Sequence, residues 1–347
     1  MRRFLPVIVL VLFAPVLAEL LWGSTTISKA FVLIAELPMY GGGALLIREL
    51  VRRSGRGWGS IFLLGAAYGI VEEGLALQSF FNPTLYGASD WGARILGING
   101  VYTVWAIGYH AVWSVAIPIL LTELLFPARR DTPYLGKVGL VITAIFYVLG
   151  IGLIGLSAHS IPASAGYWAS PLLPGLALLG VIALAIVALV ILPPRTPEPP
   201  LPVNAPTPWL ILLVTALSGF AWQFLLIWLK HFIPAITQGA LVLLPLLGAL
   251  AIAGVVIVLV RQWARARNWN DLHRLALVSG ALIAHSVFGV LVLTQTTLDR
   301  VGLIILGLVM TILLALFAIQ LRRTLHPNRE HSDREQRGNK RFRFNEQ

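Results

Sequence analysis

Five ionisable side chains lie inside stretches that are otherwise apolar, and these residues are the best placed to do chemistry: Glu36, Glu72, Glu73, His110 and His285. A charged group in the hydrocarbon core of a membrane is costly unless it meets a partner, a cavity or water, so such residues mark functional sites by default. Carboxylates and imidazoles together can bind a divalent metal, activate water or relay protons. The chain has no cysteine, which excludes disulfides, thiolate metal sites and cysteine nucleophiles.

Glu72 and Glu73 are adjacent, so on a regular helix their side chains point about 100° apart. Both can reach one partner only if the helix is distorted. Two carboxyls held close together in a low dielectric do not both ionise cheaply, so one of them should carry a proton, which suits a general acid, a general base or a proton carrier. We predict Glu72, Glu73, His110 and His285 as catalytic residues, with Glu73, His110 and His285 as candidate ligands of a divalent metal.

Glu36 is followed by Pro38 and by three consecutive glycines at 41–43. This pattern predicts a break in the helix, and broken helices at membrane depth occur where backbone lines a cavity or is buried in protein. We therefore predict that Glu36 and Tyr40 line a substrate-binding pocket beside the other candidates. A kink filled by side-chain packing is the alternative.

The five candidates share a depth in the membrane. Each lies roughly 8 to 10 residues from the outer end of its helix, about 12 to 15 Å below the outer surface. Small and hydroxyl residues such as Gly65, Gly69 and Ser114 recur on the same helix faces, which favours close packing of helices. The candidates should face protein, as a functional cluster or as a structural hydrogen-bond network. Glu19 and Glu123 lie near the ends of apolar stretches and are expected to be interfacial.

Long apolar stretches must position these residues. The chain of 347 residues is 57% hydrophobic and only 12% charged, about half the charged share of a soluble domain. About 20 apolar residues in a helix cross the hydrocarbon core. We predict an all-α, polytopic bundle of about ten transmembrane helices, at residues 4–22, 28–47, 58–80, 100–126, 135–157, 171–192, 209–230, 238–260, 272–294 and 302–321.

The positive charges predict the orientation. With a cytoplasmic N-terminus, the outer loops hold only Lys29, Arg94, Lys230 and Arg300 of the 26 Lys and Arg residues, as the positive-inside rule requires. Both termini should then be cytoplasmic, in a multi-pass protein of the cell membrane. The net charge of +11 is thereby explained without a nucleic-acid partner. The first apolar stretch also fits a signal peptide cleaved after Ala18.

Composition divides the chain into four parts. Residues 1–192 form a six-helix membrane region and residues 209–321 a four-helix membrane region. Between them, eight of the sixteen residues 193–208 are proline, which predicts an extended, semi-rigid cytoplasmic linker. Residues 322–347 are rich in Arg and Lys and poor in apolar residues, which predicts a disordered basic tail. The tail could bind anionic lipid of the bilayer or act only as a topology signal.

The adjacent glutamates followed by a histidine on the next helix resemble the CPBP-type intramembrane proteases, which include the CAAX prenyl proteases and the bacteriocin-processing enzymes. In that family Glu-Glu-x-x-x-Arg, Phe-x-x-x-His and His-x-x-x-Asn are thought to activate water for peptide hydrolysis. Glu72 and Glu73 match the glutamate pair, and His110 matches the first histidine. Leu77, Ala106 and Gly289 stand where the family has arginine, phenylalanine and asparagine, the last counted from His285.

Three classes of function remain open. An intramembrane hydrolase would use Glu72 or Glu73 as general base, with His110 and His285 to activate water or bind metal. A proton- or cation-coupled secondary transporter would use the same carboxylates to carry the coupling ion. A non-catalytic membrane scaffold would use them only to hold helices together.

Overall fold

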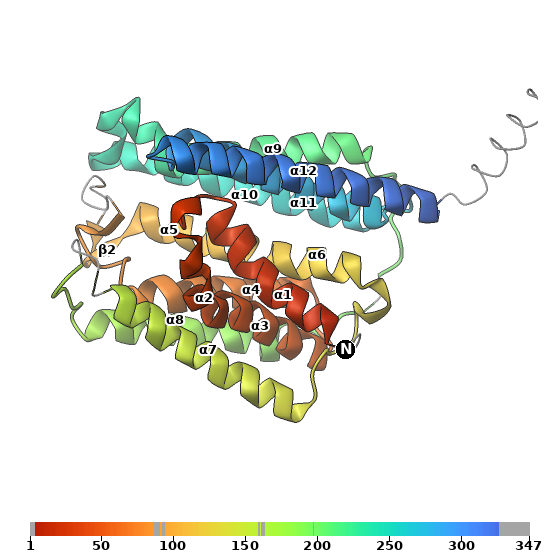
Figure 1. The fold of residues 1–347 in the computed structure, drawn as a ribbon, viewed down its shortest axis with the longest axis horizontal. Coiled ribbons are helices and arrows are strands. Elements are labelled where there is room, and N and C mark those ends of the chain that lie inside the picture. Colours follow the sequence, from red (N-terminus) through yellow and green to blue (C-terminus); the bar gives the residue numbers. More distant parts are fainter. Residues whose placement is uncertain are drawn as a thin grey trace, which may run out of the picture.

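The computed structural model of the chain describes residues 4–86, 91, 94–158, 160, 164–196 and 198–325. Within these residues the chain is a bundle of helices with one short hairpin, as the all-α prediction requires. Figure 1 shows the helices of residues 208–325, coloured green to blue, as a layer along the top of the helices that precede them. His159 and residues 326–347 of the predicted disordered tail lie outside the described residues. Residues 322–325 of that tail continue the last helix, so the prediction of disorder is wrong for them.

The first region contains α-helices, shorter 3-10 and π segments, and a hairpin turned by Leu96 and Gly97, both with the positive φ that tight hairpins use. Its elements are α1 (Leu5–Pro15), η1 (Val16–Leu20), η2 (Ile27–Val32), α2 (Leu33–Glu36), η3 (Leu37–Gly41), α3 (Gly42–Arg53), α4 (Trp58–Ile70), η4 (Val71–Ala76), β1 (Arg94–Ile95), β2 (Ile98–Asn99), α5 (Gly100–Tyr109), η6 (His110–Ala116), α6 (Ile117–Leu125), η7 (Pro127–Arg129), α7 (Lys137–Ala158), α8 (Leu172–Ile186) and η8 (Val187–Ile191).

The second region begins with a proline in the first turn of α9, where a missing N–H costs nothing. Its elements are α9 (Pro208–Gln223), η9 (Phe224–Trp228), η10 (Leu229–His231), η11 (Pro234–Thr237), η12 (Gly239–Val242), α10 (Leu243–Ala264), α11 (Asp271–Val292) and α12 (Thr297–Leu325).

Nine helices of the described residues are long and apolar enough to cross a membrane, and they coincide with nine of the ten expected spans. The first expected span is shorter. Its apolar helix runs over Leu5–Leu20, a rise of about 24 Å against a hydrocarbon core of about 30 Å. Gly23, with φ of +89°, turns the chain soon after this helix ends.

The predicted break after Glu36 is wrong. The chain stays helical through η3 into α3, and the residue with non-helical dihedrals lies earlier, at Lys29. The glycines serve close packing instead. A Cβ on Gly41 would lie 2.5 Å from the carbonyl oxygen of Val11, and one on Gly43 would lie 2.6 Å from the ring of Tyr68.

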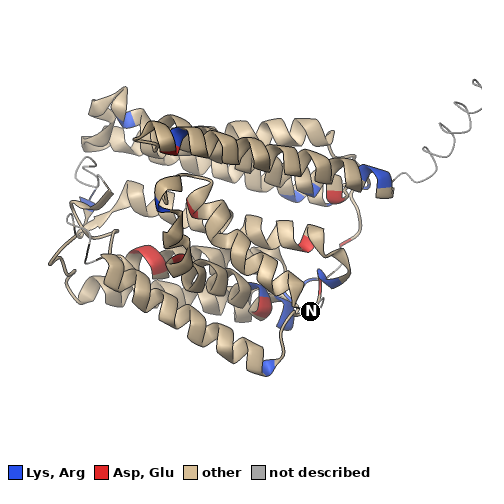
Figure 2. Ribbon diagram, in the orientation of Figure 1, with Lys and Arg blue, Asp and Glu red and all other residues tan. Residues whose placement is uncertain are grey.

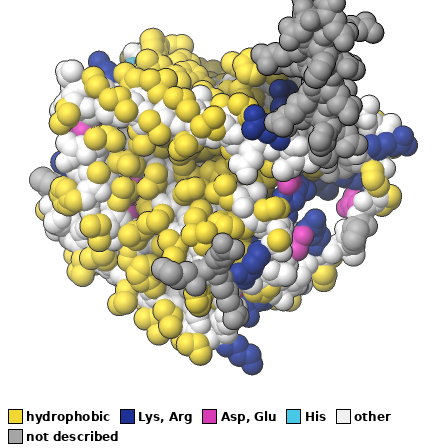
Figure 3. Space-filling view, turned by 45° about the vertical axis from the view of Figure 1, so that its right-hand side comes forward, with side chains coloured by type: hydrophobic (Ala, Val, Ile, Leu, Met, Phe, Trp, Pro, Cys, Tyr) yellow, Lys and Arg dark blue, Asp and Glu magenta, His cyan; other side chains and the backbone are white. Residues whose placement is uncertain are grey.

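Burial separates the central helices from the lipid-facing ones. In the spans Trp58–Ala76 and Gly100–Leu125, 67% and 72% of the residues in the apolar 18-residue stretch are buried inside the protein. In Leu172–Ile191 the share is 6%. The exposed side chains of the outer helices are large and apolar, and Figure 3 shows hydrophobic side chains covering much of one face. Such a surface suits lipid, so the residues that need protein partners belong on the two central spans.

Most Lys and Arg residues gather toward the end of the bundle where the N-terminus lies (Figure 2). We call this the basic end. Here Glu123 accepts hydrogen bonds from Arg48 at 3.0 Å and from Arg52 at 2.8 Å, and Arg48 stacks on Tyr134 at 3.3 Å. Glu123 lies near the end of its span, as expected, but it is 1% exposed and is a buried ion-pair partner.

Polar contacts join the two membrane regions at several levels. Arg130 pairs with Asp271 at 2.7 Å near the basic end, and Trp113 donates to the carbonyl of Ala281. Leu201 in the proline-rich linker forms a parallel bridge with Ala266. The described parts of both regions therefore pack as one bundle.

Close packing of α9 on α11 predicts a matched pair of stability effects. A Cβ on Gly280 would overlap Thr215 Oγ1 and Leu212 O, whereas one on Gly254 would meet nothing within 4 Å. We expect Gly280→Ala to destabilise the protein by about 1–3 kcal/mol through overpacking. Gly254→Ala should be neutral or stabilise it by up to about 1 kcal/mol. Thermal unfolding in detergent measures both, and equal melting temperatures would contradict this packing.

Candidate functional site

His110 lies between the carboxyl groups of Glu72 and Glu73. Its Nδ1 is 3.4 Å from Glu72 Oε2, and its Nε2 is 3.3 Å from Glu73 Oε1. The hydroxyl of Ser114 is also 2.9 Å from Nδ1. His110, Glu72 and Glu73 are at most 5% exposed. The structure therefore brings together three of the four residues predicted as catalytic.

Helix widening lets two adjacent glutamates reach one imidazole. Glu72 and Glu73 lie in the π-helical η4, where the N–H of Leu77 bonds to the carbonyl of Glu72 at 2.8 Å. His110 is the first residue of another π segment, η6. A π turn contains one residue more than an α turn and is frequent at functional sites. This is the distortion that the adjacent glutamates required.

Glycines bring the two central helices together at this level. A Cβ on Gly65 would lie 2.9 Å from Ala111 Cα, and one on Gly69 would lie 3.1 Å from His110 Cβ. The absence of side chains at these positions lets α4 and η6 approach closely. His110 thereby comes within reach of η4.

The Tyr40 hydroxyl links Glu72 to a fourth acidic residue, Glu19. It lies 2.5 Å from Glu72 Oε1 and 2.6 Å from Glu19 Oε1. A phenol has one proton to donate and an ionised carboxylate can only accept. When both contacts are hydrogen bonds, one of the two carboxyls must itself donate and is therefore protonated.

Glu73 accepts hydrogen bonds on the other side of His110. The hydroxyl of Tyr102 donates to Glu73 Oε2 at 3.0 Å, and the hydroxyl of Ser79 donates to the same oxygen. Ser79 also donates to the backbone carbonyl of Glu73 at 3.0 Å. These donors fix the carboxyl that faces Nε2 of His110.

Glu19 was missed as a site residue. It lies in the π-helical η1 and is held by Tyr40 and by the hydroxyl of Ser24, at 2.5 Å from Glu19 Oε2. The sequence predicted an interfacial position for Glu19 because the first apolar stretch ends at residue 22. The signal that could have found it is an acid within an apolar run, four residues before Gly23.

Glu36 lies to one side of this chain of contacts. Its Oε1 accepts a hydrogen bond from Thr25 at 2.5 Å, while its Oε2 is buried without a partner. Glu36 and Tyr40 were predicted together as a substrate-binding pair, but Tyr40 contacts Glu19 and Glu72 instead.

Little positive charge balances these acids. Within the described residues, no Lys or Arg forms an ion pair with Glu19, Glu36, Glu72 or Glu73, and His110 contacts only Glu72 and Glu73. Four ionised carboxylates beside one imidazolium would leave uncompensated buried charge, which is strongly unfavourable. The cluster of Glu19, Tyr40, Glu72, Glu73 and His110, which we call the acid cluster, must hold protons.

His285 does not contact the acid cluster's carboxyls. Its ring stacks between Trp22 and Trp113, with centroids 5.8 Å and 5.5 Å away. Its Nε2 lies 3.1 Å from the carbonyl oxygen of Leu17, and the Tyr109 ring packs beside it. Because a carbonyl only accepts, Nε2 carries the proton in this contact. His285 thus joins the second region to η1.

Residues 8–190 match a family described as an uncharacterized membrane protein family. The chain belongs to this family. The match covers just over half of the chain and includes every residue of the acid cluster, whereas His285 lies outside it. No match was found among curated proteins or among solved structures. The chain is therefore a multi-pass membrane protein.

In this family member the candidate metal ligands do not converge. Among the described residues, no three His, Asp or Glu side chains are arranged to hold one metal ion. Glu73 and His110 contact each other, but His285 lies among aromatic rings. The set Glu73, His110 and His285 is therefore not assembled as a metal site.

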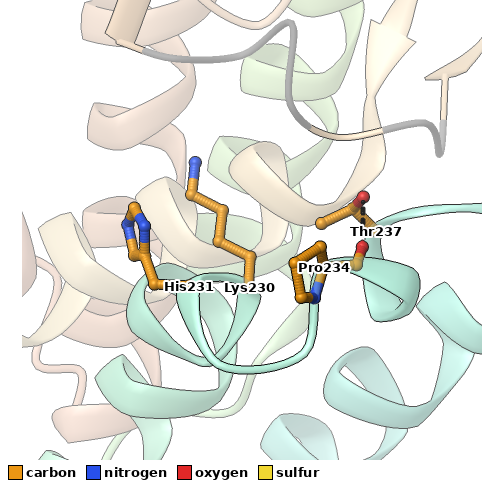
Figure 4. Close-up of a pocket in the computed structure, with 4 residues that line it drawn as sticks. All are labelled: Lys230, His231, Pro234 and Thr237. Atoms are coloured by element: carbon orange, nitrogen blue, oxygen red, sulfur yellow. Dashed lines mark hydrogen bonds between the residues drawn. The ribbon is translucent and has the colours of Figure 1, made fainter.

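A cavity of about 240 Å³ lies away from the acid cluster. Figure 4 shows its lining side chains, Lys230, His231, Pro234 and Thr237, where the chain leaves α9. Thr237 donates to the backbone carbonyl of Pro234 at 2.9 Å, so its hydroxyl is already engaged. None of these residues contacts the acid cluster in the described structure.

Two buried tyrosines allow the bridging role of Tyr40 to be tested. Tyr40→Phe leaves Glu19 and Glu72 without their shared donor, and we expect a loss of about 1–3 kcal/mol of stability. Tyr134 is also buried, it lies away from the cluster at the basic end, and its hydroxyl has no hydrogen-bond partner. Tyr134→Phe should therefore be neutral or slightly stabilising. Thermal unfolding of both variants at one pH measures these changes in stability. An equal loss of stability in both variants would rule out the bridging role of Tyr40.

Proposed function

We propose that this protein is a proton-coupled secondary transporter of the cell membrane, in which the acid cluster carries the coupling proton. The observation that supports this most is a continuous series of polar contacts from Glu19 through Tyr40 and Glu72 to His110 and Glu73. Tyr40, Glu72, Glu73 and His110 are buried and Glu19 is partly buried, and all five lie in the matched family region.

The series can pass a proton without changing the charge of any intermediate group, with His110 ending in its other tautomer and the Tyr40 hydroxyl turned to its other partner. When Glu19 gives its proton to the Tyr40 oxygen, the Tyr40 hydroxyl gives its own proton to Glu72. Glu72 then protonates Nδ1 of His110, and Nε2 releases a proton to Glu73. Each donor and acceptor in this sequence is within 3.4 Å of the next. The contact of Glu72 Oε2 with Nδ1 lacks hydrogen-bond geometry, so this transfer requires a small movement of the side chains.

Helix geometry also favours transport. The groups of the cluster come from η1, η3, η4 and η6, where the helices depart from α geometry. These are π segments, which keep helical hydrogen bonds and are frequent at functional sites. Changes in the protonation of this cluster would alter the contacts between four segments at once, which couples proton binding to helix rearrangement.

Proton flux tests the proposal. In proteoliposomes with an entrapped pH indicator, voltage clamped by potassium and valinomycin, the wild type should equilibrate an imposed pH step faster than empty liposomes. Glu72→Gln should slow this flux by on the order of a hundredfold, since glutamine cannot relay a proton. Glu198→Gln, at an exposed ion pair with Arg265, is the matched control and should behave as wild type. A wild-type rate equal to that of Glu72→Gln would refute the proposal.

A CPBP-like intramembrane hydrolase is the second candidate. It is favoured by one observation, that His110 contacts both members of the adjacent glutamate pair, the residues that carry the resemblance. Glu73 would accept a proton from the attacking water, and His110 would stabilise the resulting charge. His285, which the same hypothesis places in the site, contacts other residues.

Product analysis tests the hydrolase. The reconstituted protein would be incubated with a set of membrane-spanning peptides, and products identified by mass spectrometry. The hydrolase predicts new peptide termini that form with the wild type and not with Glu73→Gln. Cleavage that persists in Glu73→Gln would exclude this mechanism.

A further inference from the structure

The acid cluster reaches the protein surface at Ser24. The hydroxyl of this exposed residue donates to Glu19 Oε2 at 2.5 Å, and Glu19 is in turn bonded to Tyr40. Ser24 follows the turn at Gly23, which lies at the far end of α1 and η1 from the basic end. Glu19 is itself partly exposed, so the series of contacts reaches the surface at Glu19 and Ser24.

The surface around Ser24 is polar. Ser28 and Lys29 are exposed on the following segment, and the backbone N–H of Ser28 bonds to Asp299 at 2.9 Å. Arg300, the next residue on α12, is exposed as well. Exposed charged groups of this kind lie at the membrane–water interface and not in hydrocarbon. Ser24 is therefore accessible to water.

Toward the basic end the acid cluster is closed. Arg48 lies roughly two turns beyond Tyr40, about 12 Å along the helix. Between these levels the buried side chains are mainly apolar, including Ala44, Leu64, Val115 and Ile119.

We infer that Ser24 and Glu19 form the port through which the acid cluster exchanges protons with water at the end opposite the basic one. By the positive-inside rule this is the outer side of the membrane. The inference rests on the proposed proton-coupled function and adds to it the residue that receives the proton and the side from which it comes.

Variants of the port separate this inference from the proposed function. In the flux measurement above, Glu19→Gln should reduce the rate to the level of Glu72→Gln. Ser24→Ala, a substitution at an exposed position that should not disturb folding, should slow the flux a few-fold. If Glu72→Gln slows the flux and Glu19→Gln does not, the port is wrong and the proposed function stands. If the wild type shows no flux above Glu72→Gln, both fail.

The absence of cysteine from the chain allows the side to be tested directly. Ser24→Cys would carry the single thiol of the protein, as would the control Ser28→Cys four residues along the same exposed segment. A charged, membrane-impermeant thiol reagent added to the outer side of right-side-out vesicles should label both variants but slow flux only in Ser24→Cys. Labelling of Ser24→Cys only from the cytoplasmic side, or without loss of flux, would overturn the inference.

Discussion

Carboxyl groups buried in a membrane must be satisfied by other buried groups, and the centre of this molecule is organised by that constraint. Glu19, Glu72 and Glu73 have no Lys or Arg ion-pair partner in the described structure, and tyrosine, serine and histidine side chains contact them instead. The partners come from several helices. Satisfying the acids therefore fixes how these helices pack, and it leaves protons on the carboxyls as the means of limiting charge.

Local helix distortion is the second element of the arrangement. Regular α geometry would direct Glu72 and Glu73 about 100° apart, whereas the π segment η4 allows both to contact His110. Glycines at 65 and 69 allow the facing helix to come close enough for these contacts. At the basic end, by contrast, Arg48 and Arg52 neutralise Glu123 directly. Buried acids are therefore neutralised in two ways in this protein: by arginine at the basic end and by shared protons in the acid cluster.

The sequence predicts most of the fold, because a transmembrane helix is specified by the length and hydropathy of a local segment. It predicts Glu72, Glu73 and His110 as candidates for the same reason: acids and histidines inside apolar segments are conspicuous. It does not predict that Tyr40 joins Glu19 to Glu72, or that His285 turns to Leu17 and the tryptophans. These contacts depend on rotation of helices about their axes and on π segments, which are tertiary effects. The prediction of a helix break at the glycines after Glu36 failed for the same reason, because glycine both weakens a helix and allows helices to pack closely.

A protonated carboxyl at neutral pH is the most direct consequence of the acid cluster. Infrared difference spectroscopy of the protein in lipid, exchanged between H₂O and D₂O, detects the C=O stretch of such a group. The account predicts a carboxylic-acid band at neutral pH that diminishes in Glu72→Gln and is unchanged in Glu198→Gln. A wild-type spectrum with no protonated carboxyl at neutral pH would contradict it, because the buried acids would then all be ionised.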